Sequence, residues 1–286
     1  MKYILILLVF LLFFLIEFFL FNGRKKELFI YICRYIFINI VLFYFVINIY
    51  NKNFDFYLMI IFMVKIIVDK LLVFKKIEFK LTNWEIYYKK KPLKIVTKKR
   101  ENNINYILNI LKEAHFKNFL NVLEYGGGNS RVAEAISKKY NIKKFTIVDN
   151  NEWGIKLLKE RKIKNLNSQC ISIFDYEDEN NYDLIYSIGL IEHFQDKNLT
   201  KCIQEHFKLV KNKSYVLFTF PIPTLRYKFI RFIYELFDKW QYTDETPLTN
   251  SKVEKLVSKY GKIIYNGINK ELILPQGVIL VMKENK

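Results

Sequence analysis

The sequence predicts an α/β protein, with a doubly wound, seven-stranded and mostly parallel sheet preceded by a helical membrane anchor. Two observations predict this arrangement. From residue 101 onward, short apolar runs alternate with amphipathic segments, the pattern of strands joined by helical crossovers. Residues 1–74 are instead almost entirely apolar, and their length is sufficient for several membrane crossings. We therefore expect membrane helices at 1–76, a linker at 77–100 and a globular domain at 101–286.

Three apolar stretches are candidate membrane spans: residues 3–21, 28–50 and 56–74. The third carries Lys65, Asp69 and Lys70, and a position in the membrane interface is its alternative. A secretory signal peptide is the alternative for the first stretch, but no small-residue cleavage site follows it. Basic residues belong on the cytoplasmic side, and they occur in the loop at 24–26 and again after residue 74. Three spans place both basic segments inside, whereas two spans would leave the first one outside. We expect an integral membrane protein whose globular domain is cytoplasmic.

The linker at 77–100 mixes lysines with Trp84, Tyr87 and Tyr88. Lysines next to a membrane attract anionic lipid, and Trp and Tyr favour the level of the lipid headgroups. This composition indicates a connector that lies on the cytoplasmic membrane surface.

The globular domain is interpreted element by element from its periodicity. A helix with Ile104, Ile107, Leu108 and Leu111 on one face comes first. The expected strands are 119–125, 144–149, 169–175, 182–189, 214–220, 262–267 and 277–283, and the expected helices follow residue 130 and lie at 151–161, 197–211 and 225–240. Ser251 and Glu254 form a predicted capping box for a last helix, which Gly261 ends. Ligands of such sheets bind at the carboxyl ends of the strands.

The chain carries a formal charge of +18, which is typical of proteins that bind nucleic acid or an anionic membrane. Its lysines are scattered and no nucleic-acid-binding motif occurs, so we do not expect a nucleic-acid partner. Cys33, Cys170 and Cys202 form neither a disulfide framework nor a zinc pattern, and we expect no metal site.

A glycine-rich turn, in the stretch VLEYGGGNS at 122–130, follows the first strand of the domain. Glycines there let a ligand approach the backbone and the start of the next helix. A nucleoside triphosphate would need Gly-Lys-Ser/Thr, which is absent, and a dinucleotide would need a third glycine where Arg131 stands. Glu124, at the end of the strand, instead suits a ligand with a cationic group.

The spacing Glu124-x-Gly126-x-Gly128-x-Ser130 resembles motif I of the class I S-adenosylmethionine-dependent methyltransferases. The resemblance covers residues 101–286 and implies a Rossmann-like methyltransferase fold with S-adenosylmethionine as cofactor. In that family the acid of motif I faces the methionine end, a second acid holds the ribose and a third position contacts the adenine. The implied cofactor-binding residues are Glu124, Tyr125, Gly126, Gly127, Gly128, Ser130, Asp149, Asn150, Asp175, Tyr176, Ser187 and Ile188.

The tail of the fourth strand, Ile191 to Phe194, resembles the Leu-Glu-His-hydrophobic tail of the same family. Transfer to a hydroxyl needs a base, and His193 is the candidate, with Glu192 as a substitute. A histidine that only packs beneath the cofactor is the alternative. His115 and His206 are expected on helices away from the strand ends. The Asn/Asp-Pro-Pro-aromatic motif of nucleobase amino methylation is absent.

The helix expected at 225–240 has an apolar face too wide for burial on one side, which indicates core packing, a lid or a membrane-facing element. Tyr242, Asp244 and Glu245 then form a polar turn suited to sugar hydroxyls. This region resembles methyltransferases of bacterial surface-glycan synthesis.

We predict a membrane-anchored methyltransferase that O-methylates a lipid-linked or membrane-associated acceptor, such as a surface-glycan precursor. Its partners would be the lipid bilayer and that small-molecule acceptor. Methylation of an isoprenoid quinone or a lipid headgroup remains open, as do a non-catalytic S-adenosylmethionine-binding scaffold and a transporter-linked regulatory domain. The sequence does not predict an oligomeric state.

Overall fold

The structure, a computed structural model, describes residues 81–89, 98–116, 121–179, 181–236 and 239–284. The chain divides into two compact units, Met1–Glu78 and Phe79–Lys286, and all the described residues belong to the second.

The three predicted membrane spans, at 3–21, 28–50 and 56–74, lie outside the described residues. Within the described part of the chain, no helix combines the length and the apolar character that crossing a bilayer requires.

Helices and strands alternate along the second unit, as the periodicity predicts. In chain order they are α4 (Trp84–Lys89), α5 (Lys98–Glu113), β1 (Asn121–Tyr125), α6 (Arg131–Lys139), β2 (Lys144–Asp149), α7 (Glu152–Lys159), β3 (Leu166–Cys170), β4 (Tyr182–Ile188), the 3₁₀ turn η2 (Ile191–His193), α8 (Asp196–Lys208), β5 (Val210–Pro221), α9 (Leu225–Leu236), α10 (Asn250–Val257), β6 (Gly261–Asn269) and β7 (Gln276–Lys283).

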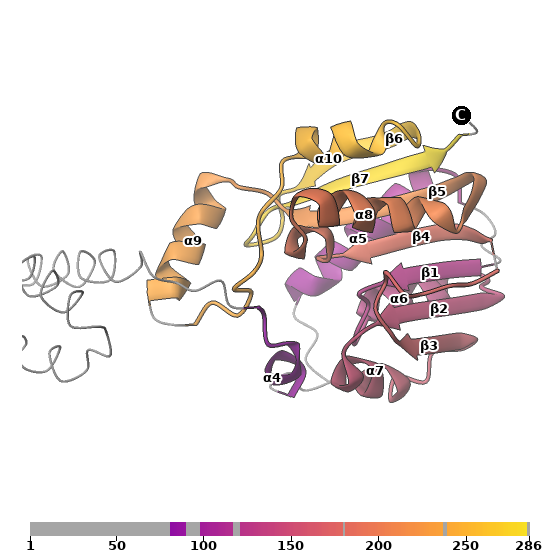
Figure 1. The fold of residues 1–286 in the computed structure, drawn as a ribbon, viewed down its shortest axis with the longest axis horizontal. Coiled ribbons are helices and arrows are strands. Elements are labelled where there is room, and N and C mark those ends of the chain that lie inside the picture. Colours follow the sequence, from indigo (N-terminus) through magenta and orange to yellow (C-terminus); the bar gives the residue numbers. More distant parts are fainter. Residues whose placement is uncertain (1–80, 90–97, 117–120, 180, 237–238, 285–286) are drawn as a thin grey trace, which may run out of the picture. The chain divides into compact units, whose positions relative to one another are not determined.

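The strands of the described residues form one seven-stranded sheet in the order β3-β2-β1-β4-β5-β7-β6 (Figure 1). Strands β1 to β5 pair in parallel, and β7 is antiparallel to both β5 and β6. The predicted seven-stranded, mostly parallel sheet is confirmed, with one antiparallel strand inserted near its end.

Two apolar cores cover the two faces of the sheet. One core joins the sheet to buried residues of α5, α6 and α7, and the other joins it to α8 and α10. Successive residues of β1 alternate between the cores, since Val122 belongs to the first and Leu123 and Tyr125 belong to the second. This alternation decides which strand-end side chains can reach a site.

Two predicted elements are wrong in detail. The strand expected at 169–175 ends at Cys170, because β3 is an edge strand and the apolar run beyond it forms a turn that buries Ile173. The expected cap of the last helix is also displaced. Thr249, not Ser251, is the N-cap of α10, and its side chain accepts a hydrogen bond from the N–H of Lys252.

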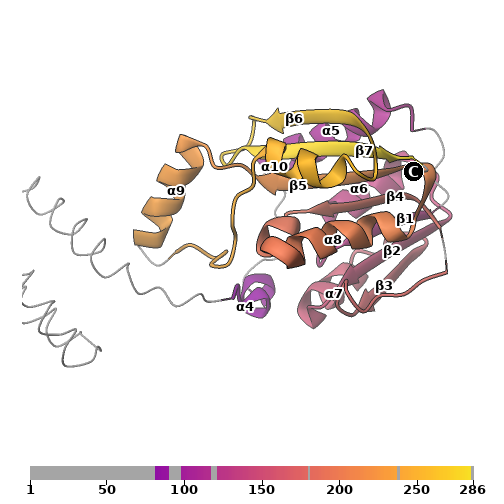
Figure 2. The same cartoon turned by 45° about the horizontal axis from the view of Figure 1, so that its top comes forward.

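The carboxyl ends of the parallel strands face the same edge of the sheet as α4 and α9, as the two views of the fold show (Figures 1 and 2). Helix α9 ends at Leu236, earlier than predicted, and it exposes Leu225 and Phe229 at 85% and 66% of their surface.

Candidate functional site

The glycine-rich turn leaves β1 in a conformation that favours glycine. Gly126 and Gly128 have φ values of +67° and +41°, in the left-handed region. A Cβ at Gly126 would lie 2.7 Å from a side-chain carbon of Leu190, and one at Gly128 would lie 1.8 Å from the hydroxyl oxygen of Tyr88. These glycines therefore admit a close approach, and the groups that approach them belong to the protein.

Ser130 ends the turn and begins α6. Its hydroxyl oxygen caps the helix by accepting a hydrogen bond from the N–H of Ala133 at 3.0 Å. The cap fixes the direction of α6 behind the turn.

Two cavities open at this edge of the sheet, with volumes of about 410 and 320 Å³. Five residues line both of them: Trp84, Tyr88, Gly126, Gly189 and His193. The cavities therefore meet at the glycine turn, and α4 and η2 contribute to the shared boundary.

Most of the predicted site residues lie at these cavities. The larger cavity is lined by Glu124, Gly126, Gly127, Ser130, Ile188, Glu192 and His193, and the smaller one by Gly126, Asp149, Asn150 and His193. Gly128 lies against Tyr88, which lines both.

Five predicted residues line neither cavity: Tyr125, Gly128, Asp175, Tyr176 and Ser187. Tyr125 is buried on the opposite side of β1 from Glu124, next to the ring of His206. Asp175 is exposed, and Tyr176 is buried with its hydroxyl on Asp178.

The structure also adds residues that the sequence interpretation missed. Ile173 and Phe174 line the smaller cavity in place of Asp175 and Tyr176, because the turn after β3 begins earlier than expected. Trp84 and Tyr88 come from the segment interpreted as a membrane-surface connector. Their aromatic side chains were the sequence signal for a place at the cavity. Aromatic residues are also common in membrane-interface segments, so this signal did not distinguish the two.

Glu124 is a buried carboxylate at the larger cavity, 2% exposed, and Tyr186 donates a hydrogen bond to it at 2.7 Å. Burial raises the pKa of Glu124 to about 7, although the hydrogen bonds from Ser130 and Tyr186 oppose the shift. A cationic group in the cavity would relieve this destabilised charge.

Asp149 is the matching carboxylate at the smaller cavity. It accepts the N–H of Asn151 at 2.8 Å, and burial raises its pKa to about 6 against the effect of the N–H groups of Asn151 and Gly128. Two buried acids, one at each of the joined cavities, fit a ligand with an ammonium group and neutral hydroxyl donors. S-adenosylmethionine has both.

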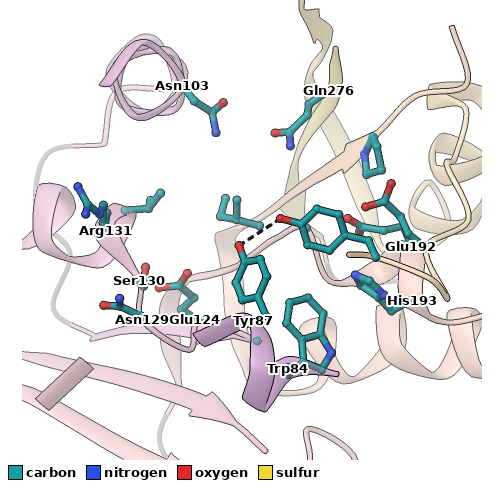
Figure 3. A pocket seen from close by; sticks show the side chains of 18 of the residues that line it. Trp84, Tyr87, Asn103, Glu124, Asn129, Ser130, Arg131, Glu192, His193 and Gln276 are labelled. Atoms are coloured by element: carbon teal, nitrogen blue, oxygen red, sulfur yellow. Dashed lines mark hydrogen bonds between the residues drawn. The ribbon is translucent and has the colours of Figure 1, made fainter. Parts of the chain in front are cut away.

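His193 ends η2 and lines both cavities. Figure 3 shows its ring among the side chains of one of them. Its Nδ1 lies 2.8 Å from Oδ1 of Asp244, and the ring of Trp84 meets its ring edge-on with 5.1 Å between centroids. Burial alone would lower the pKa of His193, but the bond to Asp244 and the nearby acidic groups outweigh it and raise the pKa. These contacts hold the imidazole in one orientation.

Glu192 is 2% exposed, and its Oε2 has no hydrogen-bond partner among the described residues. Burial raises its pKa to about 8, against the attraction of His193. Glu192, His193 and Glu245 place donor atoms within 4.8 Å of one another, and within the described ranges these are the side chains that could hold a metal ion.

The other two histidines lie away from the cavities, as expected. His115 is exposed in the turn after α5. His206 is buried in α8, where its Nδ1 lies 2.8 Å from the carbonyl oxygen of Cys202 and burial lowers its pKa to about 4.

Comparison with known proteins identifies this arrangement. Residues 122–213 match the family model described as a methyltransferase domain. A comparison with curated proteins found no match.

Several solved structures share the fold. The N-methyltransferase NodS from Bradyrhizobium japonicum WM9, in complex with S-adenosyl-L-homocysteine, is similar at 10% identity and a TM-score of 0.52, covering 66% of this chain and 89% of NodS. Magnesium protoporphyrin IX methyltransferase from Synechocystis PCC 6803 is similar at 11% identity and a TM-score of 0.54, covering 65% of this chain and 84% of that enzyme.

The plantazolicin methyltransferase BpumL is similar at 16% identity and a TM-score of 0.52, covering 70% of this chain and 90% of BpumL. The family match and the shared fold show that this chain carries a methyltransferase domain, with the fold of the S-adenosylmethionine-dependent enzymes. The chain is a methyltransferase.

Proposed function

We propose that this methyltransferase acts on a hydroxyl group of a membrane-associated acceptor, such as a lipid-linked precursor of a surface glycan. The observation that carries the proposal is the pairing of His193 with Asp244 at the boundary of the two cavities. A hydroxyl must lose its proton to accept a methyl group, whereas a neutral amine attacks with its lone pair. An oriented imidazole therefore favours an oxygen acceptor.

The cofactor is S-adenosylmethionine, which when bound supplies a methyl group on a sulfonium. Glu124 would hold its amino group, and Asp149 its ribose hydroxyls. Ile173 and Phe174 would lie beside the adenine in the smaller cavity.

The residues of the chain then orient the acceptor and receive its proton. With Nδ1 engaged by Asp244, Nε2 of His193 would be the nitrogen free to accept the proton of the acceptor hydroxyl. The larger cavity also has apolar walls, including Ile104, Leu272 and Leu274, which limit the access of water. Most of the rate enhancement would come from this positioning.

Membrane association of the acceptor is supported by two features. The predicted spans at 3–21, 28–50 and 56–74 would tether the domain, which is useful when the acceptor itself is held in the bilayer. On α9, the exposed Leu225 and Phe229 accompany the exposed cations Arg226 and Lys228, a combination suited to an anionic membrane surface. We propose an integral membrane protein with its catalytic domain in the cytoplasm.

The proposal is tested with the purified full-length chain, methyl-labelled S-adenosylmethionine and a bacterial membrane extract. We expect label in the lipid fraction and none when the extract is delipidated first. Label in the delipidated extract at an equal rate would contradict a lipid acceptor. Mass spectrometry of membrane lipids and glycans from a deletion strain, searched for species that lack one methyl group, then identifies the acceptor.

The base is tested by His193→Ala, which should lower turnover by about 10²–10⁴-fold while leaving the affinity for S-adenosylmethionine nearly unchanged. The matched control is His115→Ala, because His115 is exposed and distant from the cavities. Unchanged turnover in His193→Ala would remove this residue from the mechanism. Loss of activity on chelation, restored by Mg²⁺, would instead assign Glu192, His193 and Glu245 to a metal ion.

A further inference from the structure

We propose that the segment Leu81–Lys89 is part of the active site: Thr82 fixes Asp244, and Asp244 is the positioning residue of His193. The inference rests on the proposed role of His193 as a base. It changes the meaning of this segment, which its composition alone assigns to the membrane surface.

Three side chains from distant parts of the chain form a continuous hydrogen-bonded series. The hydroxyl of Thr82 donates to Oδ1 of Asp244, and the same oxygen lies 2.8 Å from Nδ1 of His193. Thr82 is 7% exposed and Asp244 6% exposed, so water competes little for either group. The series therefore holds the imidazole in one orientation.

Aromatic contacts hold the same segment against the loop that carries Asp244. The ring of Trp84 lies 5.1 Å from that of His193 and 6.2 Å from that of Tyr242, measured between centroids. The hydroxyl of Tyr242 donates to that of Tyr87 at 3.1 Å, the contact drawn in Figure 3. The segment thus touches His193 directly and also supports its partner.

The chemistry of the series follows from its charges. Asp244 accepts the Nδ1 proton and so favours the tautomer of His193 that leaves the Nε2 lone pair free. The acidic groups that face His193 are Glu192 on η2 and Asp244 and Glu245 on the loop after α9, and all three favour the protonated ring. The donor from Thr82 helps to keep Asp244 ionised, because burial opposes that charge.

The test reads His193 directly by NMR in the full-length chain, labelled with ¹⁵N-histidine and held in detergent micelles. The chain has three histidines, so its spectrum is simple, with the exposed His115 as an internal reference and the buried His206 as a reporter of the intact core. The neutral wild-type ring should be the Nδ1–H tautomer.

Asp244→Asn should lower the pKa of His193 and reduce the population of its Nδ1–H tautomer. Because the base must be neutral, the acidic limb of the pH–rate profile should move to lower pH, and turnover should fall by about 100-fold through misorientation. Thr82→Val should reduce the Nδ1–H population and turnover in part, and Thr82→Ser should restore both.

Thr246→Val is the matched control. It removes a hydroxyl from the loop that carries Asp244, and that hydroxyl contacts Gln195, not Asp244. The proposal fails if Thr82→Val keeps the wild-type tautomer and turnover while the His206 signal is unchanged. It also fails if Thr246→Val has the same effect as Thr82→Val. The tautomer of His193 is measured without a methyl acceptor. A failed methyl-transfer assay would therefore overturn the proposed function but not the role of Thr82 and Asp244 in orienting His193.

Discussion

Two buried carboxylates illustrate how single residues prepare the site. Glu124 and Asp149 lie in the last two residues of parallel strands, and burial raises the pKa of each toward neutrality. Neither charge has a cationic side chain among the groups that shift its pKa. A bound ligand would therefore supply the positive or hydrogen-bond-donating groups that stabilise these carboxylates.

The pKa of Glu124 gives a prediction with a definite sign. Below its pKa of about 7 the side chain is neutral, and above it the carboxylate attracts the amino group of the cofactor. The affinity for S-adenosylmethionine should therefore rise by about tenfold between pH 6 and pH 8, following the ionised fraction. Isothermal titration calorimetry of the full-length chain measures this rise.

Glu124→Gln provides the control, with weaker binding and only the smaller pH dependence that Asp149 contributes in the same direction. An affinity that falls with pH in the wild-type chain would show that Glu124 does not meet the amino group of the cofactor.

At this scale the sequence predicts the position of a residue best where a strand end is unambiguous. Glu124, Asp149 and His193 follow clear apolar runs, and all three reach the cavities. Asp175 and Tyr176 do not, because their assignment depended on a strand that ends earlier. Asp244 reaches His193 through tertiary packing, which no local pattern encodes.

The glycine turn and α4 are the elements that define the boundary of the two cavities. Gly128 has φ of +41°, and the hydroxyl of Tyr88 occupies the space that a Cβ would need. The glycine turn therefore packs directly against α4, in addition to any contact that it makes with the cofactor.

Gly128→Ala should destabilise the domain and weaken cofactor binding. A non-glycine residue in the left-handed region costs about 1–2 kcal/mol, which lowers the melting temperature of a domain of this size by about 2–8 °C, and displacement of Tyr88 adds to it. Thermal unfolding and calorimetry with S-adenosylmethionine measure the two effects.

Gly267→Ala is a suitable control, because its φ is not positive and a Cβ there would meet only the end of the Tyr265 side chain. A melting temperature of Gly128→Ala equal to that of the wild-type chain would show that Gly128 tolerates a side chain.

Sequence patterns predict the type of most elements but not the role of α4. A short segment rich in Trp, Tyr and Lys satisfies the pattern of a membrane interface. The same composition is typical of a helix that covers a polar cavity. In both environments the aromatic rings are buried and the lysines are hydrated. The choice depends on contacts with residues such as Tyr242, far away in sequence.

On the scale of the whole molecule, the compact unit begins at Phe79, ahead of the domain predicted at 101–286. The additional residues include Thr82, Trp84 and Tyr88, all at the cavities. The periodicity of the sheet could not reveal this extension, because α4 is not one of its crossover helices.

A chain that starts at residue 79 should keep the stability and cofactor affinity of the domain, whereas one that starts at 101 should bind S-adenosylmethionine at least about fivefold more weakly. The shorter chain loses the cover that α4 provides, since Tyr88 would leave the surroundings of Gly128 and Gly154. Calorimetry on both fragments makes the comparison. Equal affinities of the two fragments for S-adenosylmethionine would show that α4 does not contribute to cofactor binding.

The inserted strand β7 has a consequence for the way the chain is made. β6 is synthesised before β7. Among the described strands, β6 pairs with β7, and β7 lies between β6 and β5. Val278 to Val281 are fully buried. A nascent chain that has reached only residue 270 therefore holds an incomplete sheet with an open edge at β5. Such an edge can pair with other chains, so the nascent chain is prone to aggregation until β7 emerges from the ribosome.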